Sequence, residues 1–115
     1  MTPEQSAAEY GYLTTRGRVT GRDHTIEIWF AHDGKAAYVL AGDGDNSDWC
    51  RNIEADPAVT FVVEDQVVGR RARRVVDPAE DAIARRVVCD KYQPGYGEDL
   101  SEWRDEATPF AVDLD

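Results

Sequence analysis

The segment Arg16–Arg22 combines three arginines with two glycines in a pattern that suits an anion. Gly17 and Gly21 allow the backbone to turn tightly and to expose its N–H groups. Arginine side chains and exposed amides together are the groups that bind phosphate, and Thr15 and Thr20 add hydroxyl donors. The segment therefore predicts a hairpin loop that binds an anion. The alternative is a solvated turn whose arginines pair with the chain's many acids.

A second loop, Gly42–Ser47, follows a predicted strand and precedes a predicted helix. It resembles a dinucleotide-binding loop, but the helix has only about two turns, which is too short for a parallel crossover. The loop also half-matches a calcium site, although Asp48 stands where such a loop needs glycine. The histidines offer no metal site either, because His24 and His32 lie about 26 Å apart on one strand. We expect no metal.

Two further groups of residues are open to more than one interpretation. The stretch Arg70–Arg74 is basic, which favours an exposed edge strand protected by charge, or alternatively a cradle for a cofactor's acidic tail. Aromatic residues such as Trp29, Tyr96 and Trp103 are unevenly placed. Some of them must be core residues, and a planar ligand would also need such walls.

The bulk properties limit the class of protein. A chain of 115 residues is the size of one domain, so residues 1–115 are expected to form a single domain. The net charge of −10 argues against nucleic-acid binding. No apolar run is long enough to span a membrane and no secretory signal is recognisable, so we expect a cytoplasmic protein. Cys50 and Cys89 are expected to be buried hydrophobic residues rather than a disulfide framework.

The chain alternates between strand-like and helical segments. Tyr10–Thr15, His24–His32 and Ala36–Ala41 predict three strands, with Asp33-Gly34 as a hairpin turn and both faces of the third strand covered. Ser47 or Asp48 begins a short helix that runs to about Ala55, and Asp77-Pro78 begins a clear helix that runs to about Tyr92. Further segments are a short turn or helix over 3–9, strands over 59–64 and 67–76, an irregular segment over 93–107 and a strand over 110–114.

The connections between these strands are mostly short hairpins. The order β-β-β-α-β-β-α-β with short links favours an antiparallel, barrel-like sheet over a doubly wound parallel one. The expected fold is therefore mainly β, of the α+β kind, with two or three short helices.

Two stretches together resemble the deazaflavin (F420)-dependent nitroreductase family. Leu13–Arg22 is similar to that family's LTT-x-GRKSG opening. Ala41–Gly44 followed by Trp49–Val59 is similar to its W-x-x-NL-x-A-x-P-x-V segment, and the strand after Pro109 also fits. The resemblance covers residues 10 to 115 and keeps the order and spacing of the motifs. It implies a six-stranded split β-barrel of the flavin-reductase type.

The resemblance also implies a function. It implies an oxidoreductase that uses a reduced deazaflavin coenzyme, F420, to transfer hydride to a quinone, enone or nitro compound. No protein nucleophile is expected, and Tyr96 or a bound water is the expected proton donor. Trp29, Tyr96 and Trp103 would line the acceptor side. The implied cofactor-binding residues are Thr15, Arg16, Arg18, Val19, Thr20, His24, Gly42, Asp43, Gly44, Trp49 and Asn52.

Two positions depart from the family pattern. Val19 stands where the family usually has a lysine, and Asp43 lies near the position of another. Losing a charged contact with phosphate costs about 1.5–3 kcal/mol, which is roughly 10- to 100-fold in affinity. An FMN-binding reductase of the same barrel class is therefore one alternative, and a non-catalytic protein that binds a cofactor or planar anion is another. By analogy with small split barrels, we expect a homodimer.

Overall fold

The computed structural model describes residues 1–115 apart from the side chain of Asp45, which lies in the calcium-like loop. Over the described residues, a single sheet has seven strands. They are β1 (Gly11–Arg16), β2 (Asp23–Ile28), β3 (Ala31–His32), β4 (Ala36–Ala41), β5 (Ala58–Val63), β6 (Gln66–Arg74) and β7 (Thr108–Leu114). Their spatial order is β2-β1-β5-β6-β7-β4-β3, and all neighbouring pairs are antiparallel.

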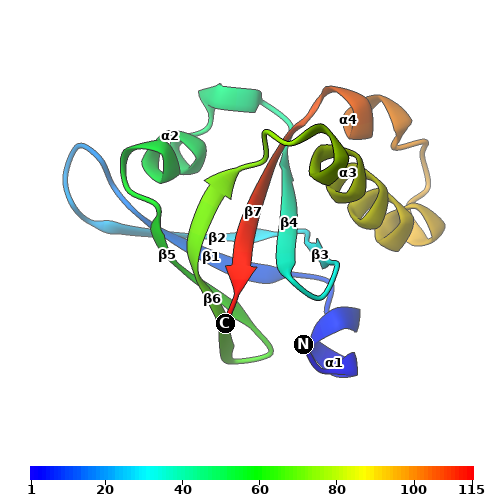
Figure 1. Cartoon of the computed structure of the whole chain (residues 1–115), viewed down its shortest axis with the longest axis horizontal. Coiled ribbons are helices and arrows are strands. Elements are labelled where there is room, and N and C mark those ends of the chain that lie inside the picture. Colours follow the sequence, from blue (N-terminus) through cyan, green and yellow to red (C-terminus); the bar gives the residue numbers. More distant parts are fainter.

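The sheet curls into a half-barrel, with β1 and β2 running across the view at the level of the lower parts of the upright β4 and β7 (Figure 1). The helices lie around it as α1 (Pro3–Ala7), α2 (Asp48–Ala55), α3 (Pro78–Tyr92) and α4 (Ser101–Glu106), with 3-10 turns η1 (Gly44–Asn46) and η2 (Gln93–Gly95). Among the described residues, no helix is both long enough and apolar enough to cross a membrane. The mainly β, antiparallel barrel class predicted from the sequence is confirmed.

Strand β4 separates the two hydrophobic clusters that hold the fold together. Ala37 and Val39 face the interior of the half-barrel with Phe61. Tyr38 and Leu40 face the layer formed by α3 and α4. All six residues of β4 are buried, which confirms that both of its faces are covered. The period of two along a strand explains why the alternate residues belong to different clusters.

Several predicted boundaries are confirmed to within about two residues. Ser47 is the N-cap residue of α2, and Asp77 caps α3 by accepting a hydrogen bond from the Glu80 amide at 2.9 Å. Gly34 has φ +91° in the predicted hairpin turn. The turn between β5 and β6 falls at residues 64–65, one residue earlier than predicted, where both φ angles are positive as a two-residue hairpin requires.

The segment predicted as one strand over 24–32 is broken into β2 and β3, which makes seven strands instead of six. The backbone N–H and carbonyl of Phe30 form hydrogen bonds with side chains of α3 instead of with a neighbouring strand. Its N–H donates to the Tyr92 hydroxyl at 3.0 Å, and its carbonyl accepts from Lys91 Nζ at 2.9 Å. Because Phe30 is fully buried, these bonds fix the bend between the strands.

Two other predictions are wrong. The segment over 93–107 is not wholly irregular, because it contains η2 and the six-residue helix α4. The basic stretch is not an edge strand, because β6 lies between β5 and β7. Its arginines instead pair with acids, namely Arg70 with Asp115, Arg73 with Glu80 and Asp113, and Arg74 with Glu54.

Gly69 is required by the close approach of β6 and β7. A Cβ atom there would lie 2.6 Å from both the Asp113 carbonyl oxygen and Val112 Cγ1. We expect Gly69→Ala to lower the free energy of unfolding by about 1–3 kcal/mol, because the backbone must shift to remove the overlap. Urea unfolding measures this change. Gly95→Ala is the control, since no atom lies within 4 Å of a Cβ at that position, and equal effects of the two variants would contradict this explanation.

Buried Tyr38 joins two carboxylates near the β3–β4 hairpin. Its hydroxyl lies 3.0 Å from both Asp33 Oδ2 and Glu80 Oε2. Burial opposes ionisation of Asp33, but hydrogen bonds from the backbone amides of Ala36 and Lys35 and from Tyr38 outweigh it and lower its pKa. Two hydrogen bonds from Arg73, with Tyr38 adding to them, lower the pKa of Glu80. Both carboxylates therefore stabilise the fold in their charged form.

This arrangement predicts a pH-dependent loss of stability. Both pKa values are lower in the folded state, so the stabilisation is present above about pH 4 and is lost as the pH falls through the folded values. We expect Tyr38→Phe to destabilise the fold by about 1–2 kcal/mol near neutral pH and by less near pH 3. Urea unfolding at both pH values measures this, and an effect that does not change with pH would contradict it.

Candidate functional site

The loop between β1 and β2 is closed by its own backbone. The Gly17 amide donates to the Arg22 carbonyl at 2.8 Å, and the Gly21 amide donates to the Gly17 carbonyl at 2.8 Å. Gly21 has φ +74°, which favours glycine. A Cβ on Gly17 would lie 2.9 Å from the Arg22 oxygen and 3.0 Å from His24 Nε2. The two glycines therefore fix the loop and allow His24 to lie against it.

Asn52 anchors this loop to α2. Its Oδ1 accepts from the Arg18 amide at 3.2 Å and from Arg18 Nη1 at 2.8 Å, while its Nδ2 donates to the Thr15 hydroxyl at 3.1 Å. Asn52 and Thr15 are 2% and 1% exposed. Arg18 Nη2 also lies 3.3 Å from Asp48 Oδ1, whose side chain is 87% exposed. The side chain of Arg18 is thus held in one place by two residues of α2.

A small cavity of about 150 Å³ lies beside Arg18. It is lined by Gly17, Arg18, Val19, Thr20, His24, Asp48 and Asn52. The amides of Val19 and Thr20 have no hydrogen-bond acceptor within the described part of the chain. A guanidinium, a histidine and two unpaired amides make a donor-rich set that fits an anion such as phosphate. Val19 is 86% exposed and contributes no charge, so Arg18 is the cation that lines this cavity.

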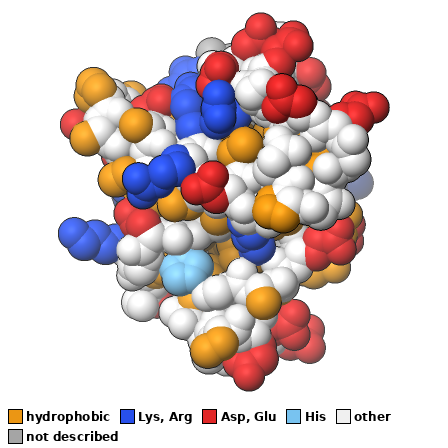
Figure 2. Space-filling view, turned by 90° about the vertical axis from the view of Figure 1, so that its right-hand side faces the viewer, with side chains coloured by type: hydrophobic (Ala, Val, Ile, Leu, Met, Phe, Trp, Pro, Cys, Tyr) orange, Lys and Arg blue, Asp and Glu red, His pale blue; other side chains and the backbone are white. Residues whose placement is uncertain are grey.

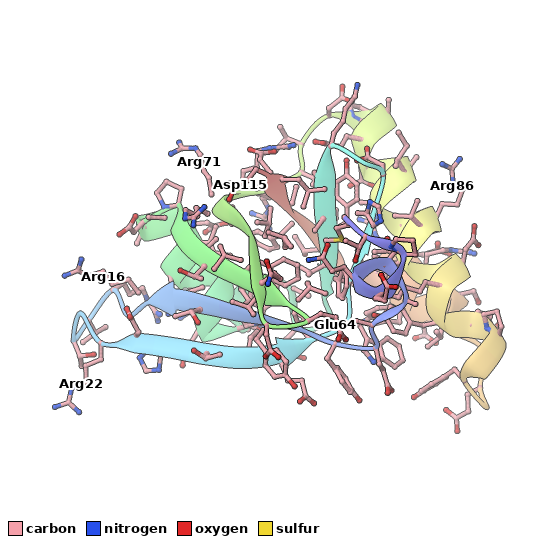
Figure 3. The ribbon with its side chains drawn as sticks, turned by 90° about the horizontal axis from the view of Figure 1, so that it is seen from below. Arg16, Arg22, Glu64, Arg71, Arg86 and Asp115 are labelled. Atoms are coloured by element: carbon pink, nitrogen blue, oxygen red, sulfur yellow. The ribbon has the colours of Figure 1, made fainter. Side chains whose placement is uncertain are left out.

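Arg16 and Arg22 are not part of this cavity. Figure 3 shows both side chains pointing outward from the β1–β2 loop, away from the body of the protein. Arg16 lines a separate shallow depression with Asp23 and Asp56. Of the three arginines noted in the sequence, Arg18 therefore lines the cavity, whereas Arg16 and Arg22 lie at the surface.

A larger cavity of about 600 Å³ lies between α4 and the end of β4. Trp29, Tyr96 and Trp103 line it together. The role of these three residues at the acceptor side stays a prediction. The Trp29 ring meets those of Tyr96 and Trp103 edge-on, at 5.6 and 5.9 Å between centroids, and it stacks on Tyr92 at 4.2 Å. These contacts fix the positions of the aromatic side chains, and aromatic side chains of this kind pack against planar ligands.

The outer margin of this aromatic cavity is acidic. Four carboxylate side chains belong to its lining, namely Glu98, Asp99, Glu102 and Glu106. Acidic side chains gather at the top of the face shown in Figure 2, where α4 lies. Gly42 lines the cavity too, and a Cβ on it would lie 3.4 Å from Trp103 Nε1. The basic and acidic parts of the candidate site are therefore at different places in the fold.

The remaining predicted cofactor residues do not line these two cavities. Thr15 is buried against Asn52, and Trp49 packs edge-on against Phe110 at 5.3 Å between ring centroids. Asp43 and Gly44 belong to the segment 42–48, which connects the two cavities. Gly42 at its start lines the aromatic cavity, and Asp48 at its end lines the small cavity beside Arg18, called the Arg18 cavity below. Tyr92 was among the aromatic residues noted in the sequence but was not assigned to the site, and in the structure it supports Trp29 by stacking.

Comparison with known proteins decides the family. The model of the F420H2-dependent quinone reductase family matches residues 5–115. The chain belongs to this family. It is therefore an oxidoreductase that uses the deazaflavin coenzyme F420, as the resemblance of its motifs implied. A search of curated proteins gives no significant match.

Solved structures of other proteins share the fold of this F420H2-dependent quinone reductase family member. A structure described as an F420-H2 dependent reductase is 19% identical, with a TM-score of 0.72, and the match covers 90% of this chain and 93% of that one. An F420 reductase is 23% identical over 100% of this chain and 95% of its own, with a TM-score of 0.66. A conserved hypothetical protein of Mycobacterium tuberculosis is 21% identical over 97% and 79%, with a TM-score of 0.72.

Proposed function

We propose that this protein reduces a quinone with hydride from F420H2, and that the two cavities hold the two ends of the cofactor. The observation that carries this proposal is the segment 42–48, which begins at the aromatic cavity and ends at the Arg18 cavity. A cofactor with a planar ring and a phosphate needs an aromatic wall and an anion site on one continuous surface. Enones and nitro compounds are the alternative acceptors.

The phosphate end of the cofactor is assigned to the β1–β2 loop. Arg18 supplies the charge, the amides of Val19 and Thr20 supply neutral donors, and His24 lines the same cavity. Asn52 keeps Arg18 in position instead of contacting the cofactor itself, because its oxygen already accepts two hydrogen bonds from Arg18. Asp48 competes with the phosphate for Arg18, and its exposure allows it to move aside.

The reaction end is assigned to the aromatic cavity. When bound, F420H2 supplies the hydride. Trp29 and Trp103 exclude water and hold planar groups, and Gly42 leaves room for them because it has no side chain. The Tyr96 hydroxyl is the proposed proton donor to the acceptor oxygen, since Tyr96 lines the cavity and is partly exposed to solvent.

Steady-state oxidation of F420H2 tests the function. We expect turnover with a small neutral quinone such as menadione, and slower turnover by Tyr96→Phe if the phenol delivers the proton. Turnover with reduced FMN is compared with turnover with F420H2, because Val19 stands where the family usually has a lysine that helps to bind the phosphate of F420. Turnover with reduced FMN but not with F420H2 would overturn the assignment of the cofactor site.

A homodimer in the cytoplasm remains part of the proposal. A structural neighbour at 19% identity is described as a domain-swapped dimer, and that description applies to the neighbour. Light scattering after size-exclusion chromatography measures the mass in solution. A mass equal to that of one 12.9 kDa chain would exclude a stable dimer.

A further inference from the structure

A second large cavity adjoins the aromatic cavity on its other side. It has a volume of about 650 Å³ and lies between the segment that follows α1 and the C-terminal end of α3. Trp29 and Tyr96 line both cavities, so they form a shared wall. The other lining side chains include Ser6, Glu9, Tyr10, Lys91 and Tyr92. The proposed reductase function assigns no role to this cavity.

Lys91 is the cation that lines this second cavity. Its Nζ donates to the Ala8 carbonyl at 2.7 Å and to the Phe30 carbonyl at 2.9 Å, and it lies 3.8 Å from the centroid of the Phe30 ring. An ammonium group has three donors, and the two backbone bonds leave one N–H without a hydrogen-bond acceptor among the described residues, with the Phe30 ring beside it. The backbone therefore holds Nζ in place, and an oxyanion in the cavity would accept from that N–H in competition with the Phe30 ring.

The charge of Lys91 has no counter-ion in the protein. Within the described part of the chain, none of the carboxylates lies within ion-pair distance of its Nζ. Burial lowers the pKa of Lys91 to about 8. The group is thus still charged near pH 7, but it has lost part of its hydration without gaining an opposite charge. An anion in the cavity would compensate for that loss.

The other ionisable groups near Lys91 do not neutralise it. Glu9 lines the cavity too, but it is an exposed residue and makes no ion pair with Lys91. Burial raises the pKa of Tyr92 to about 12, so its hydroxyl is neutral. Tyr10 also lines the cavity, and His32 on β3 has its pKa lowered by burial, by the terminal amino group and by the charge of Lys91. His32 is therefore mostly neutral near pH 7 and adds no competing cation.

Aromatic side chains form much of the lining of the second cavity. Trp29 and Tyr92 stack with 3° between their ring planes, and Tyr96 meets Trp29 edge-on. In Figure 2, which shows the face bearing α3 and α4, recessed hydrophobic side chains are visible near the centre with a basic side chain beside them. A single cationic donor beside aromatic walls suits one oxyanion on a planar apolar body, and a polyanion would need more donors.

We propose that the second cavity binds a planar aromatic oxyanion, a carboxylate or a phenolate, whose oxygen accepts a hydrogen bond from Lys91 and whose ring packs against Trp29 and Tyr96. The bound anion lies against the same wall as the reductase cavity. The site requires no cofactor, so it can be tested on the protein alone, separately from the reductase activity.

Isothermal titration calorimetry with 1-naphthoate and 1-naphthamide tests the site. The two compounds match in shape, and the first carries a charge. We expect 1-naphthoate to bind at least about tenfold more tightly near pH 7, because a charged hydrogen bond forms in a partly buried site. The preference should decrease as the pH rises above about 8. A second pair, 4-nitrophenolate and 4-nitroanisole, shows whether a phenolate is accepted as well as a carboxylate.

Variants at the two lysines complete the test. Lys91→Met should abolish the preference for 1-naphthoate, whereas Lys91→Arg should retain it. Lys35→Met is the matched control, because Lys35 is exposed at the β3–β4 hairpin, and it should leave the preference unchanged. Thermal unfolding checks that each variant folds. If Lys91→Met does not fold, the wild-type pH series and Lys91→Arg still decide the matter. Equal affinities for the two naphthyl compounds in the wild-type protein, or a preference that persists in Lys91→Met, would overturn the proposal.

Discussion

Replacing Arg18 with glutamine weakens the binding of F420 by about 10- to 100-fold in this account. Arg18 is the cation that lines the small cavity of the β1–β2 loop, since Val19 is neutral and Arg16 and Arg22 point away from it. Losing one charged contact with a phosphate costs about 1.5–3 kcal/mol, which corresponds to that change in affinity. Titration of the cofactor's fluorescence with protein measures the dissociation constant.

Arg16→Gln is the matched control for this prediction. Arg16 lies two residues from Arg18 and has the same side chain, but it lines a different depression. It contributes only through long-range attraction, which salt screens, so the affinity should change by no more than about threefold at physiological ionic strength. Equal losses in the two variants would mean that the overall charge of the loop, and not the geometry of Arg18, binds the cofactor.

Replacing Asn52 with alanine is expected to affect both stability and cofactor binding. The change removes three hydrogen bonds and leaves the hydroxyl of Thr15 buried without its donor. We expect the free energy of unfolding to fall by about 2–4 kcal/mol, from the lost bonds and the space left behind. Arg18 also loses its anchor, so cofactor affinity should fall by roughly 3- to 10-fold because the side chain must be ordered on binding.

Urea unfolding and the fluorescence titration measure these two effects on the same variant. Asn46→Ala is the control, because Asn46 is exposed in η1. It should change stability by less than about 0.5 kcal/mol. A loss of stability in Asn52→Ala with unchanged cofactor affinity would contradict the positioning role of Asn52 while leaving its structural role intact.

Local features of the fold were predictable from the sequence. The continuous apolar run of β4, the Asp77-Pro78 start of α3 and the Asp33-Gly34 hairpin depend on neighbouring residues, and all three are confirmed. The motif order also predicted the family correctly. The split between β2 and β3 was not predictable, because it depends on Tyr92, which is far away in the sequence and binds the Phe30 backbone.

Long-range pairing explains the other differences. The arginine-rich strand β6 is internal because the C-terminal strand β7 pairs with it, and no local pattern around Arg70–Arg74 indicates that. The candidate site shows the same limit. The sequence predicted an anion-binding loop, but only the folded chain distinguishes Arg18, which Asn52 and Asp48 hold, from Arg16 on the outside. Lys91 belongs to no motif in the sequence, and only the folded chain shows that no carboxylate of the described residues pairs with it.

The most direct test of the central claim compares two ligands that differ in the phosphate. One is the 5′-phosphate of the ribityl deazaflavin that forms the core of F420, and the other is the same ribityl deazaflavin without the phosphate. In the wild-type protein we predict that the phosphorylated ligand binds about 10- to 100-fold more tightly than the unphosphorylated one, and that Arg18→Gln removes most of this difference. Equal affinities of the wild-type protein for the two ligands would contradict the assignment of the Arg18 loop as the phosphate site.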